Sequence, residues 1–166
     1  MKKTLALLAG ILFLSIAGYA QNKTLPSVNV KTLEGQSINV QTLGQTGKIT
    51  VISFWATWCS PCKKELDAIS EIYEDWQKKY DVELIAISTD DARSAAKVPG
   101  VVDAKGWKYR ILLDSSKELS IAANIQSVPY TFLLDQKGNI VYEHIGYAPG
   151  DEDELEERIA ALAGKK

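Results

Sequence analysis

The chain has 166 residues, with 19 basic and 21 acidic side chains and a net charge of −2. This balance provides no strongly basic surface, so we expect neither nucleic acid nor an anionic membrane surface as a partner. The length suits one domain with a substantial hydrophobic core. Both cysteines fall within four consecutive residues, which favours a shared chemical role over a structural one.

The first twenty residues have the pattern of a secretory signal peptide. Lys2 and Lys3 precede an uncharged run from Leu5 to Ile16, and Gly18 and Ala20 stand at the cleavage positions. We expect cleavage after residue 20, export to the periplasm or another extracytoplasmic space, and one domain over residues 21–166. An uncleaved membrane anchor is the less favoured alternative, because the run is shorter than the ~20 residues that a span needs.

The next part of the chain predicts a β-hairpin and then a buried strand. Residues 28–31 and 37–40 alternate apolar and polar side chains around a turn at 33–36. A polar connector, residues 44–48, leads into residues 49–53, which are mostly β-branched and apolar. That composition is typical of a buried strand.

A long amphipathic helix is predicted from about Ser60 to Lys79, with its end at Asp81. Residues 82–88 then predict a second buried strand, parallel to the first if the helix is a crossover. The apolar residues of the helix recur every three or four positions, which places them on one face: Leu66, Ile69, Ile72, Tyr73, Trp76 and Tyr80.

The rest of the chain alternates helices and strands, which indicates an α/β protein with a mixed sheet and helices on its faces. We expect Asp90 or Asp91 to cap a helix over 92–98, which Pro99 and Gly100 should break or kink. The later elements are a strand over 109–113, a short helix over 119–123 capped by Ser115 or Ser116, a hairpin of 131–135 and 140–145, and a helix from Asp151.

The sequence Cys59-Ser60-Pro61-Cys62 stands where the first buried strand turns into the long helix. Cys59 should lie at or just before the first helical turn, with Pro61 inside that turn, where its missing N–H costs nothing. Free backbone N–H groups and the helix dipole then favour a thiolate at Cys59. Cys62 lies one turn further on, within reach of a disulfide. A disulfide that spans three residues stabilises a fold little, so the pair predicts a redox dithiol.

With this motif at a strand-to-helix turn, the sequence resembles the thioredoxin fold, and more closely the TlpA/ResA-type exported thioredoxin-like thiol–disulfide oxidoreductases. The resemblance rests on residues 54–65, on the hairpin before them, on the segment inserted after residue 88, and on Val128-Pro129-Tyr130-Thr131-Phe132-Leu133. It implies a thioredoxin fold with an N-terminal β-hairpin, an inserted helical segment and a central mixed sheet flanked by helices.

The resemblance also assigns roles to individual residues. Cys59 corresponds to the nucleophile and Cys62 to the resolving cysteine. Pro129 corresponds to the cis-proline whose loop, with Val128, packs beside the dithiol and receives the bound polypeptide. Glu65 corresponds to the acidic residue near the active site. Its position on the Cys62 side of the helix suits a proton relay, and a solvated surface charge is the alternative.

The tryptophans of the motif suggest a binding surface. We expect Trp58 to be partly exposed beside Cys59, where it contributes to substrate binding together with Pro61, and Trp55 to pack inward. Trp76 and Trp107 are expected in the core.

Two positions depart from the pattern of relatives. Thioredoxins proper carry a buried acid six residues before the first cysteine, where this chain has Ser53, so protons must be handled by another residue. Many relatives carry a helix-kinking proline two residues after the acid of the helix. Here that position is Asp67, so the helix is expected to be straighter or the carboxylate to face water.

We therefore expect a thiol–disulfide oxidoreductase without a bound cofactor, acting as a monomeric reductase of exported protein disulfides, for example in cytochrome c maturation. A separate membrane protein would supply the electrons. A copper(I) chaperone is the alternative from another class, with His144 as a possible third ligand. A thioredoxin-fold peroxidase is less favoured, because Thr57 stands two residues before Cys59 instead of three.

Overall fold

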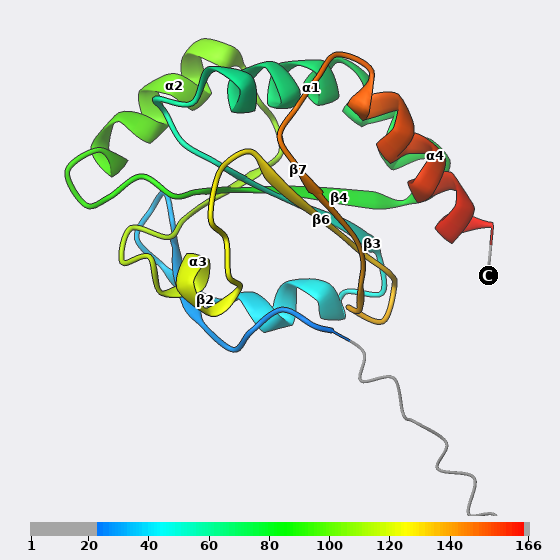
Figure 1. Cartoon of the computed structure of the whole chain (residues 1–166), viewed down its shortest axis with the longest axis horizontal. Coiled ribbons are helices and arrows are strands. Elements are labelled where there is room, and N and C mark those ends of the chain that lie inside the picture. Colours follow the sequence, from blue (N-terminus) through cyan, green and yellow to red (C-terminus); the bar gives the residue numbers. More distant parts are fainter. Residues whose placement is uncertain (1–22, 165–166) are drawn as a thin grey trace, which may run out of the picture.

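The computed structural model describes residues 23–164, which fold around one seven-stranded mixed sheet (Figure 1). The strand order is β2-β1-β5-β4-β3-β6-β7. Strands β3, β4 and β5 are parallel, and β6, β7, β1 and β2 add antiparallel pairs at the two sides. The strands are β1 (Asn29–Thr32), β2 (Ser37–Asn39), β3 (Ile49–Trp55), β4 (Val82–Ser88), β5 (Arg110–Leu113), β6 (Tyr130–Leu134) and β7 (Ile140–Ile145).

Strand β3 lies between β4 and β6, and all seven of its residues are buried. Side chains alternate between the two faces of a strand. Val51 and Trp55 accordingly join the core cluster on one face of the sheet, whereas Ile52 and Phe54 join the cluster on the other. This alternation directs Ser53 to the same face as Trp55.

The helices form a layer on each face of the sheet (Figure 1). One layer contains α1 (Ser60–Tyr80), α2 (Val98–Lys105) and α4 (Asp151–Ala163). The short helices η1 (Val40–Gln45) and α3 (Glu118–Ala122) cover the opposite face. The thioredoxin-like α/β architecture predicted from the sequence is therefore confirmed.

Helix α1 also confirms its predicted pattern. Leu66, Ile69 and Trp76 are fully buried on the face that covers the sheet. The helix ends where Asp81 adopts a left-handed conformation, with φ of 54°. Lys78 and Lys79 in the last turn suit the negative end of the helix dipole.

The inserted segment differs from the prediction. Residues 92–98 do not form the expected helix; a short 3₁₀ turn, η2 (Ala95–Lys97), precedes α2. Pro99 lies in the first turn of α2 and does not break it, because a first-turn proline loses no intrahelical hydrogen bond. Asp67 then fastens the insertion to α1: its carboxylate accepts from Trp107 Nε1 at 3.0 Å and from Lys105 Nζ at 2.5 Å.

Two predicted boundaries are also wrong. Strand β2 ends at Asn39, one residue before the predicted end. The Asn39 side chain accepts from the Gln41 N–H and caps η1, which extends into the expected polar connector. Helix α3 is not capped by either predicted serine. The buried carboxylate of Asp114 accepts from the backbone N–H groups of Leu119 and Ser120.

The predicted signal peptide, residues 1–20, lies outside the described residues. Within residues 23–164, no helix combines the length and the apolar character that crossing a bilayer requires.

Candidate active site

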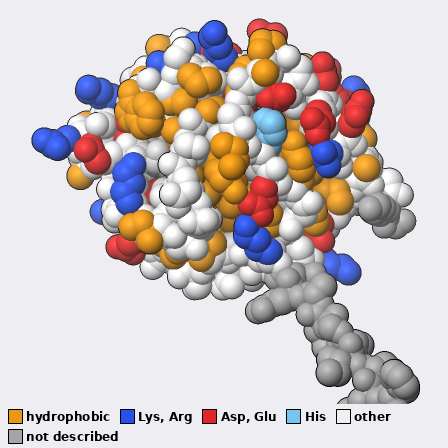
Figure 2. All heavy atoms as spheres, viewed as in Figure 1, with side chains coloured by type: hydrophobic (Ala, Val, Ile, Leu, Met, Phe, Trp, Pro, Cys, Tyr) orange, Lys and Arg blue, Asp and Glu red, His pale blue; other side chains and the backbone are white. Residues whose placement is uncertain are grey.

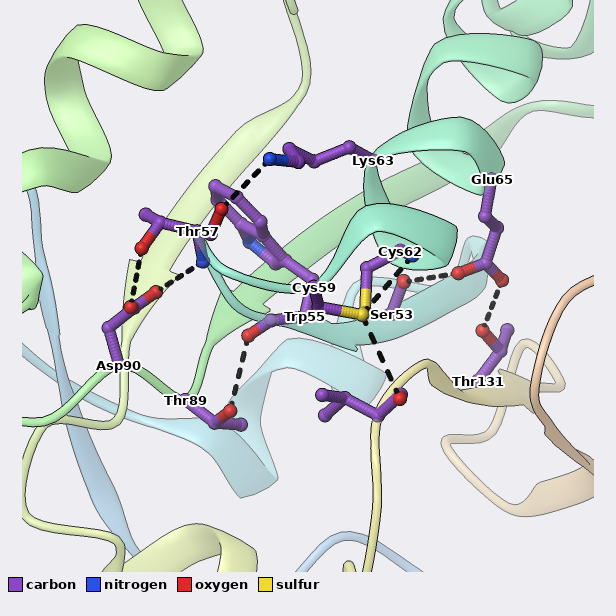
Figure 3. Close-up of a disulfide and its surroundings, with 11 residues drawn as sticks. Ser53, Trp55, Thr57, Cys59, Cys62, Lys63, Glu65, Thr89, Asp90 and Thr131 are labelled. Atoms are coloured by element: carbon purple, nitrogen blue, oxygen red, sulfur yellow. Dashed lines mark hydrogen bonds between the residues drawn. A yellow bond between two sulfur atoms is a disulfide. The ribbon is translucent and has the colours of Figure 1, made fainter.

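The two cysteines form a disulfide at the N-terminus of α1, directly after β3 and a short loop (Figure 3). The S–S distance is 1.97 Å, and the two Cα atoms lie 5.4 Å apart. Cys59 is the N-cap residue of α1 and Pro61 lies in the first turn, as predicted. The strand therefore delivers one sulfur to the end of the helix, and the helix places the second sulfur one turn inside.

The two sulfur atoms have different surroundings. The backbone N–H of Cys62 donates to Sγ of Cys59 at 3.3 Å, so the helix terminus stabilises negative charge on Cys59. The Cys59 sulfur also faces the carbonyl oxygen of Val128, which lies 3.8 Å away. Cys59 keeps 4% of its surface exposed and Cys62 keeps none. Trp58 beside them is 68% exposed, whereas Trp55 is fully buried, as predicted.

A buried carboxylate at the end of β4 holds the loop that precedes Cys59. Asp90 Oδ2 accepts from the Thr57 backbone N–H at 2.8 Å, and Oδ1 accepts from the Thr57 hydroxyl at 2.7 Å. Ser88 Oγ donates to the same carboxylate at 2.8 Å. Both oxygens of Asp90 are therefore occupied by groups that fix the loop.

Further bonds fasten this loop from both ends. The Thr89 backbone N–H donates to the Trp55 carbonyl at 2.7 Å. Lys63 Nζ donates to the Thr57 carbonyl at 2.9 Å from the first turn of α1. The loop is thus tied to β4 and to α1, which leaves little freedom for Cys59 to move.

Glu65 is buried next to the dithiol and is not a solvated surface charge. Its side chain is directed at Ser53 and Thr131, on the side of the disulfide opposite Asp90 (Figure 3). The Thr131 hydroxyl donates to Oε1 at 2.7 Å and the Ser53 hydroxyl to Oε2 at 3.2 Å. Only 5% of the residue is exposed. The buried acid therefore comes from α1 and contacts the serine that stands where thioredoxins have their acid.

Burial raises the pKa of the Glu65 carboxyl to about 7. The hydrogen bonds from Thr131 and Ser53 act in the opposite direction, because they favour the carboxylate. Burial has the larger effect. A carboxyl with a pKa near neutrality can both accept and release a proton under physiological conditions.

A groove of about 500 Å³ opens beside the disulfide, between the Trp58 loop and α3. Of the predicted substrate-binding residues, Trp58 and Val128 line this groove. Pro61 is exposed at the helix end, and Pro129 is buried behind Val128, with a cis peptide bond between the two. Other lining residues are Lys117, Ile121, Asn124 and Ile125.

His144 does not join the cysteines. Its Nε2 lies 3.1 Å from Asp151 Oδ2, and its Nδ1 lies 3.2 Å from the Tyr142 hydroxyl. Across residues 23–164, no three side chains of histidine, cysteine, aspartate or glutamate are grouped so that they could hold a metal ion.

Two parts of the site did not follow from the sequence. The sequence predicts Asp90 only as one of two candidate helix caps, although a carboxylate directly after a buried strand next to the cysteine strand is a usable signal. Asp91 is the residue that caps the following turn, through the N–H groups of Arg93 and Ser94. The contribution of α3 to the groove has no local signal, because Ile121 stands 62 positions after Cys59 along the chain.

The fold and the dithiol define a thioredoxin-like protein, and comparison with known proteins agrees. The model of the AhpC/TSA family matches residues 22–143. The thiol-disulfide oxidoreductase ResA of Bacillus anthracis is 33% identical over 124 residues, 75% of this chain and 69% of its own. Thioredoxin-like protein YneN of Bacillus subtilis is 30% identical over 156 residues, 84% of this chain and 89% of its own.

Solved structures give the same result. A thioredoxin-like protein from Porphyromonas gingivalis has a TM-score of 0.77 and 42% identity, over 87% of this chain and 95% of its own. StoA from Bacillus subtilis has a TM-score of 0.62 and 30% identity, over 78% and 98% of the two chains. The chain belongs to the AhpC/TSA family. It is a thiol–disulfide oxidoreductase of the thioredoxin-like kind.

Proposed function

We propose that Cys59 is the nucleophile and Cys62 the resolving cysteine in the reduction of protein disulfides. The Cys59 thiolate attacks a client disulfide, forms a mixed disulfide and releases the first client thiolate. The Cys62 thiol then loses its proton and attacks Cys59 Sγ, which releases the second client thiolate and leaves the Cys59–Cys62 disulfide. The unequal exposure of the two cysteine residues and the N–H bond to Cys59 are the observations that support this order.

Glu65 takes the proton from Cys62 in the resolving step. The two residues are one helical turn apart, and the carboxyl is buried in the same interior. Water has little access to Cys62, which has no exposed surface. A carboxylate with a pKa of about 7 is a suitable acceptor, because it is partly ionised at neutral pH and returns the proton easily.

The groove beside Trp58 receives the polypeptide that carries the client disulfide. Trp58, Val128 and Ile121 offer apolar surface within it, and Ile121 is 77% exposed. Pro61 and Pro129 border the disulfide at the helix end and at the adjacent loop. A client strand lying there would hold its disulfide over Cys59, the cysteine that keeps some exposed surface.

The direction of exchange is toward reduction of exported proteins, such as apocytochromes. The two residues between the cysteines are Ser60 and Pro61, so no histidine lies there. A histidine would further stabilise the thiolate, and a strong oxidant relies on such stabilisation. Residues 1–20 act as an export signal, and a separate membrane protein supplies electrons. Both cysteines, Glu65 and the groove belong to one chain, so a monomer suffices.

The two alternatives receive less support. A copper(I) chaperone loses its candidate third ligand, because both ring nitrogens of His144 face Tyr142 and Asp151. A peroxidase would use a threonine hydroxyl at the reactive cysteine. The Thr57 hydroxyl is instead bonded to Asp90.

The equilibrium reduction potential against glutathione tests the direction. A reductase should lie near the about −270 mV of thioredoxin, because a low potential makes the reduced dithiol a good electron donor. A potential near the about −120 mV of the strong oxidant DsbA would reverse the proposed direction. Fluorescence can follow the oxidation of the dithiol in this titration. The Cys59→Ala variant, which cannot form the disulfide, is the control for fluorescence changes that do not come from it.

A further inference from the structure

A small cavity lies on the side of Glu65 that faces away from β3. It is walled by α1, β6, β7 and the start of α4, and its apolar lining comes from Ile69 and Leu155. The space open to the centre of a water molecule is about 10 Å³. That is close to the minimum of about 10–15 Å³ that a cavity needs to hold one water, and such waters need several polar partners.

The polar walls of the cavity provide those partners. Glu65 forms its only two hydrogen bonds within residues 23–164 with Thr131 and Ser53, and a carboxylate has about four acceptor positions, so it can bind a water as well. The other titratable groups that line the cavity are Tyr142 and His144 from β7, Tyr147 in the loop after β7, and Asp151 and Glu152 from α4. Glu154 and Arg158 contact Tyr142 from behind.

The far wall of the cavity reaches the surface at His144 and Asp151. Their side chains are 29% and 30% exposed, so each touches both the interior and the solvent. Figure 2 shows the histidine at the surface among acidic side chains. The Asp151 carboxylate also accepts from the Ala148 N–H at 2.7 Å, which fixes it next to the ring.

The hydrogen bonds of His144 leave one nitrogen as a proton acceptor. Asp151 accepts from Nε2, which keeps that nitrogen protonated in the neutral ring. Nδ1 is then free to accept from the Tyr142 hydroxyl, which lies 3.2 Å from Nδ1 and 3.4 Å from its other acceptor, Glu154 Oε1. Tyr142 is one of the residues that line the cavity. A proton arriving on Nδ1 would form an imidazolium that Asp151 stabilises.

We propose that His144, paired with Asp151, is the group through which Glu65 exchanges protons with the solvent. This inference rests on the proposed role of Glu65 as proton acceptor for Cys62. The Cys62 proton passes to the Glu65 carboxylate, then through one water and the Tyr142 hydroxyl to His144 Nδ1, and finally to bulk water. One proton leaves the interior for each Cys62 thiolate that attacks, and no electrons move along this path.

The test separates the two thiol steps with dithionitrobenzoate. The reduced protein releases one thionitrobenzoate when Cys59 attacks and a second when Cys62 resolves the mixed disulfide, and stopped-flow absorbance follows both. We expect His144→Ala to slow the second release by roughly tenfold in dilute buffer. This loss is smaller than the about 10²–10⁴-fold that a residue contributes when it transfers a proton directly to or from the reacting group. The first release should match the parent.

Imidazole distinguishes a proton path from a structural role. Added imidazole should restore the second release in His144→Ala, because it can carry the proton from the opened cavity, and should leave the parent unchanged. His144→Gln, which keeps most of the side chain volume, should be slow in the same way. The measurements run between about pH 5.5 and 8.5, on both sides of the Glu65 pKa of about 7.

Glu143→Gln is the matched control. Glu143 is the neighbour of His144 on β7, but its carboxylate bonds Lys23 and Tyr130 on the other face of the strand. It should release both groups at the parent rate. A second release in His144→Ala that equals the parent, or that is slow and insensitive to imidazole, would overturn the proposal.

The Glu65→Gln variant shows which claim has failed. If it slows the second release and His144→Ala does not, the path through His144 is wrong and the role of Glu65 stands. If Glu65→Gln itself resolves at the parent rate, the proposed role of Glu65 fails, and the path fails with it.

Discussion

Glu65 is an acidic residue whose side chain lies in the protein interior instead of in water. A carboxylate buried to 5% exposure is penalised by lost hydration, and two hydroxyl donors compensate only part of that penalty. The resulting pKa of about 7 makes the residue an acid and a base at the same pH. Ser53, in the place of an acid on β3, is what makes room for a carboxylate from the helix.

Glu65→Gln should slow disulfide exchange near neutral pH, because the amide cannot take the Cys62 proton. The rate of the parent should rise as pH passes through about 7, where Glu65 ionises. The variant should lack that inflection, while its circular dichroism stays unchanged. An identical pH profile in parent and variant would remove Glu65 from the reaction.

The same residue should make stability depend on pH. The folded-state pKa of about 7 lies above the 4.5 of a free glutamate, so the folded form binds the extra proton between these values. This contribution is fully present below pH 4.5 and is lost as pH rises through 7, by about 3 kcal/mol in total. Urea unfolding at several pH values should show that decline in the parent and its absence in Glu65→Gln.

The sequence predicted the position of Glu65 on the helix but not its burial. A spacing of three residues from Cys62 determines the side of the helix on which it lies. Whether that side is covered depends on Thr131, which lies 66 residues away on β6. This contact depends on the order of the strands in the sheet, which no local sequence pattern predicts. The sequence alone therefore leaves a surface charge as a reasonable alternative.

At the scale of elements, the end of β4 supports the start of α1. The Asp90 carboxylate binds Thr57 twice and Ser88 once, and it is buried to 1% exposure. A buried charge is tolerated only where such donors surround it. The loop before Cys59 therefore depends on one carboxylate from a neighbouring strand.

Asp90→Asn should destabilise the protein by about 1–3 kcal/mol, because an amide cannot accept all three bonds and one buried donor is left unsatisfied. It should also slow thiol exchange through a less ordered loop. Thermal unfolding and exchange kinetics measure the two effects. Asp91→Asn is the control, since asparagine replaces aspartate well at an exposed cap. Equal behaviour of the two variants would contradict the role of Asp90.

Helix α3 contributes Ile121, one of the exposed apolar residues of the groove. Ile121→Asp should raise the KM for a protein client by about tenfold or more, because about 1.5–3 kcal/mol is typical for burying such a side chain and about 1.4 kcal/mol corresponds to a factor of ten. The reduction potential should not change. Val141→Asp tests specificity, since Val141 is exposed on β7 and does not line the groove. A KM that rises equally in both variants would place the client elsewhere.

Elements with strong periodicity were predictable, and short ones were not. The pattern of Leu66 to Trp76 defined α1, and the β-branched runs defined β3 and β4. The sequence predicts a break or kink at Pro99, because a proline inside a helix breaks it whereas a proline in the first turn does not. Only the observed start of α2 at Val98 distinguishes the two cases. The Asp114 cap was missed because the carboxylate stands four residues before α3 begins.

At the scale of the whole molecule, the sheet brings four distant segments to one end of α1. The cysteine motif follows β3, Asp90 follows β4, Val128 precedes β6, and the groove continues onto α3. On the other side of the disulfide, Glu65 leads to the cavity at β7 and α4. In the proposed mechanism, thiol exchange and proton exchange therefore have separate routes to the surface, and only Cys59 meets the client.

Trapping of mixed disulfides tests this asymmetry most directly. Cys62→Ala and Cys59→Ala, each with an affinity tag, would be expressed in the exported compartment, and captured proteins would be compared on non-reducing gels. We predict that Cys62→Ala accumulates mixed disulfides with client proteins, because Cys59 attacks and nothing releases the client. Cys59→Ala should accumulate few. Equal trapping by both variants, or trapping chiefly through Cys62, would contradict the mechanism.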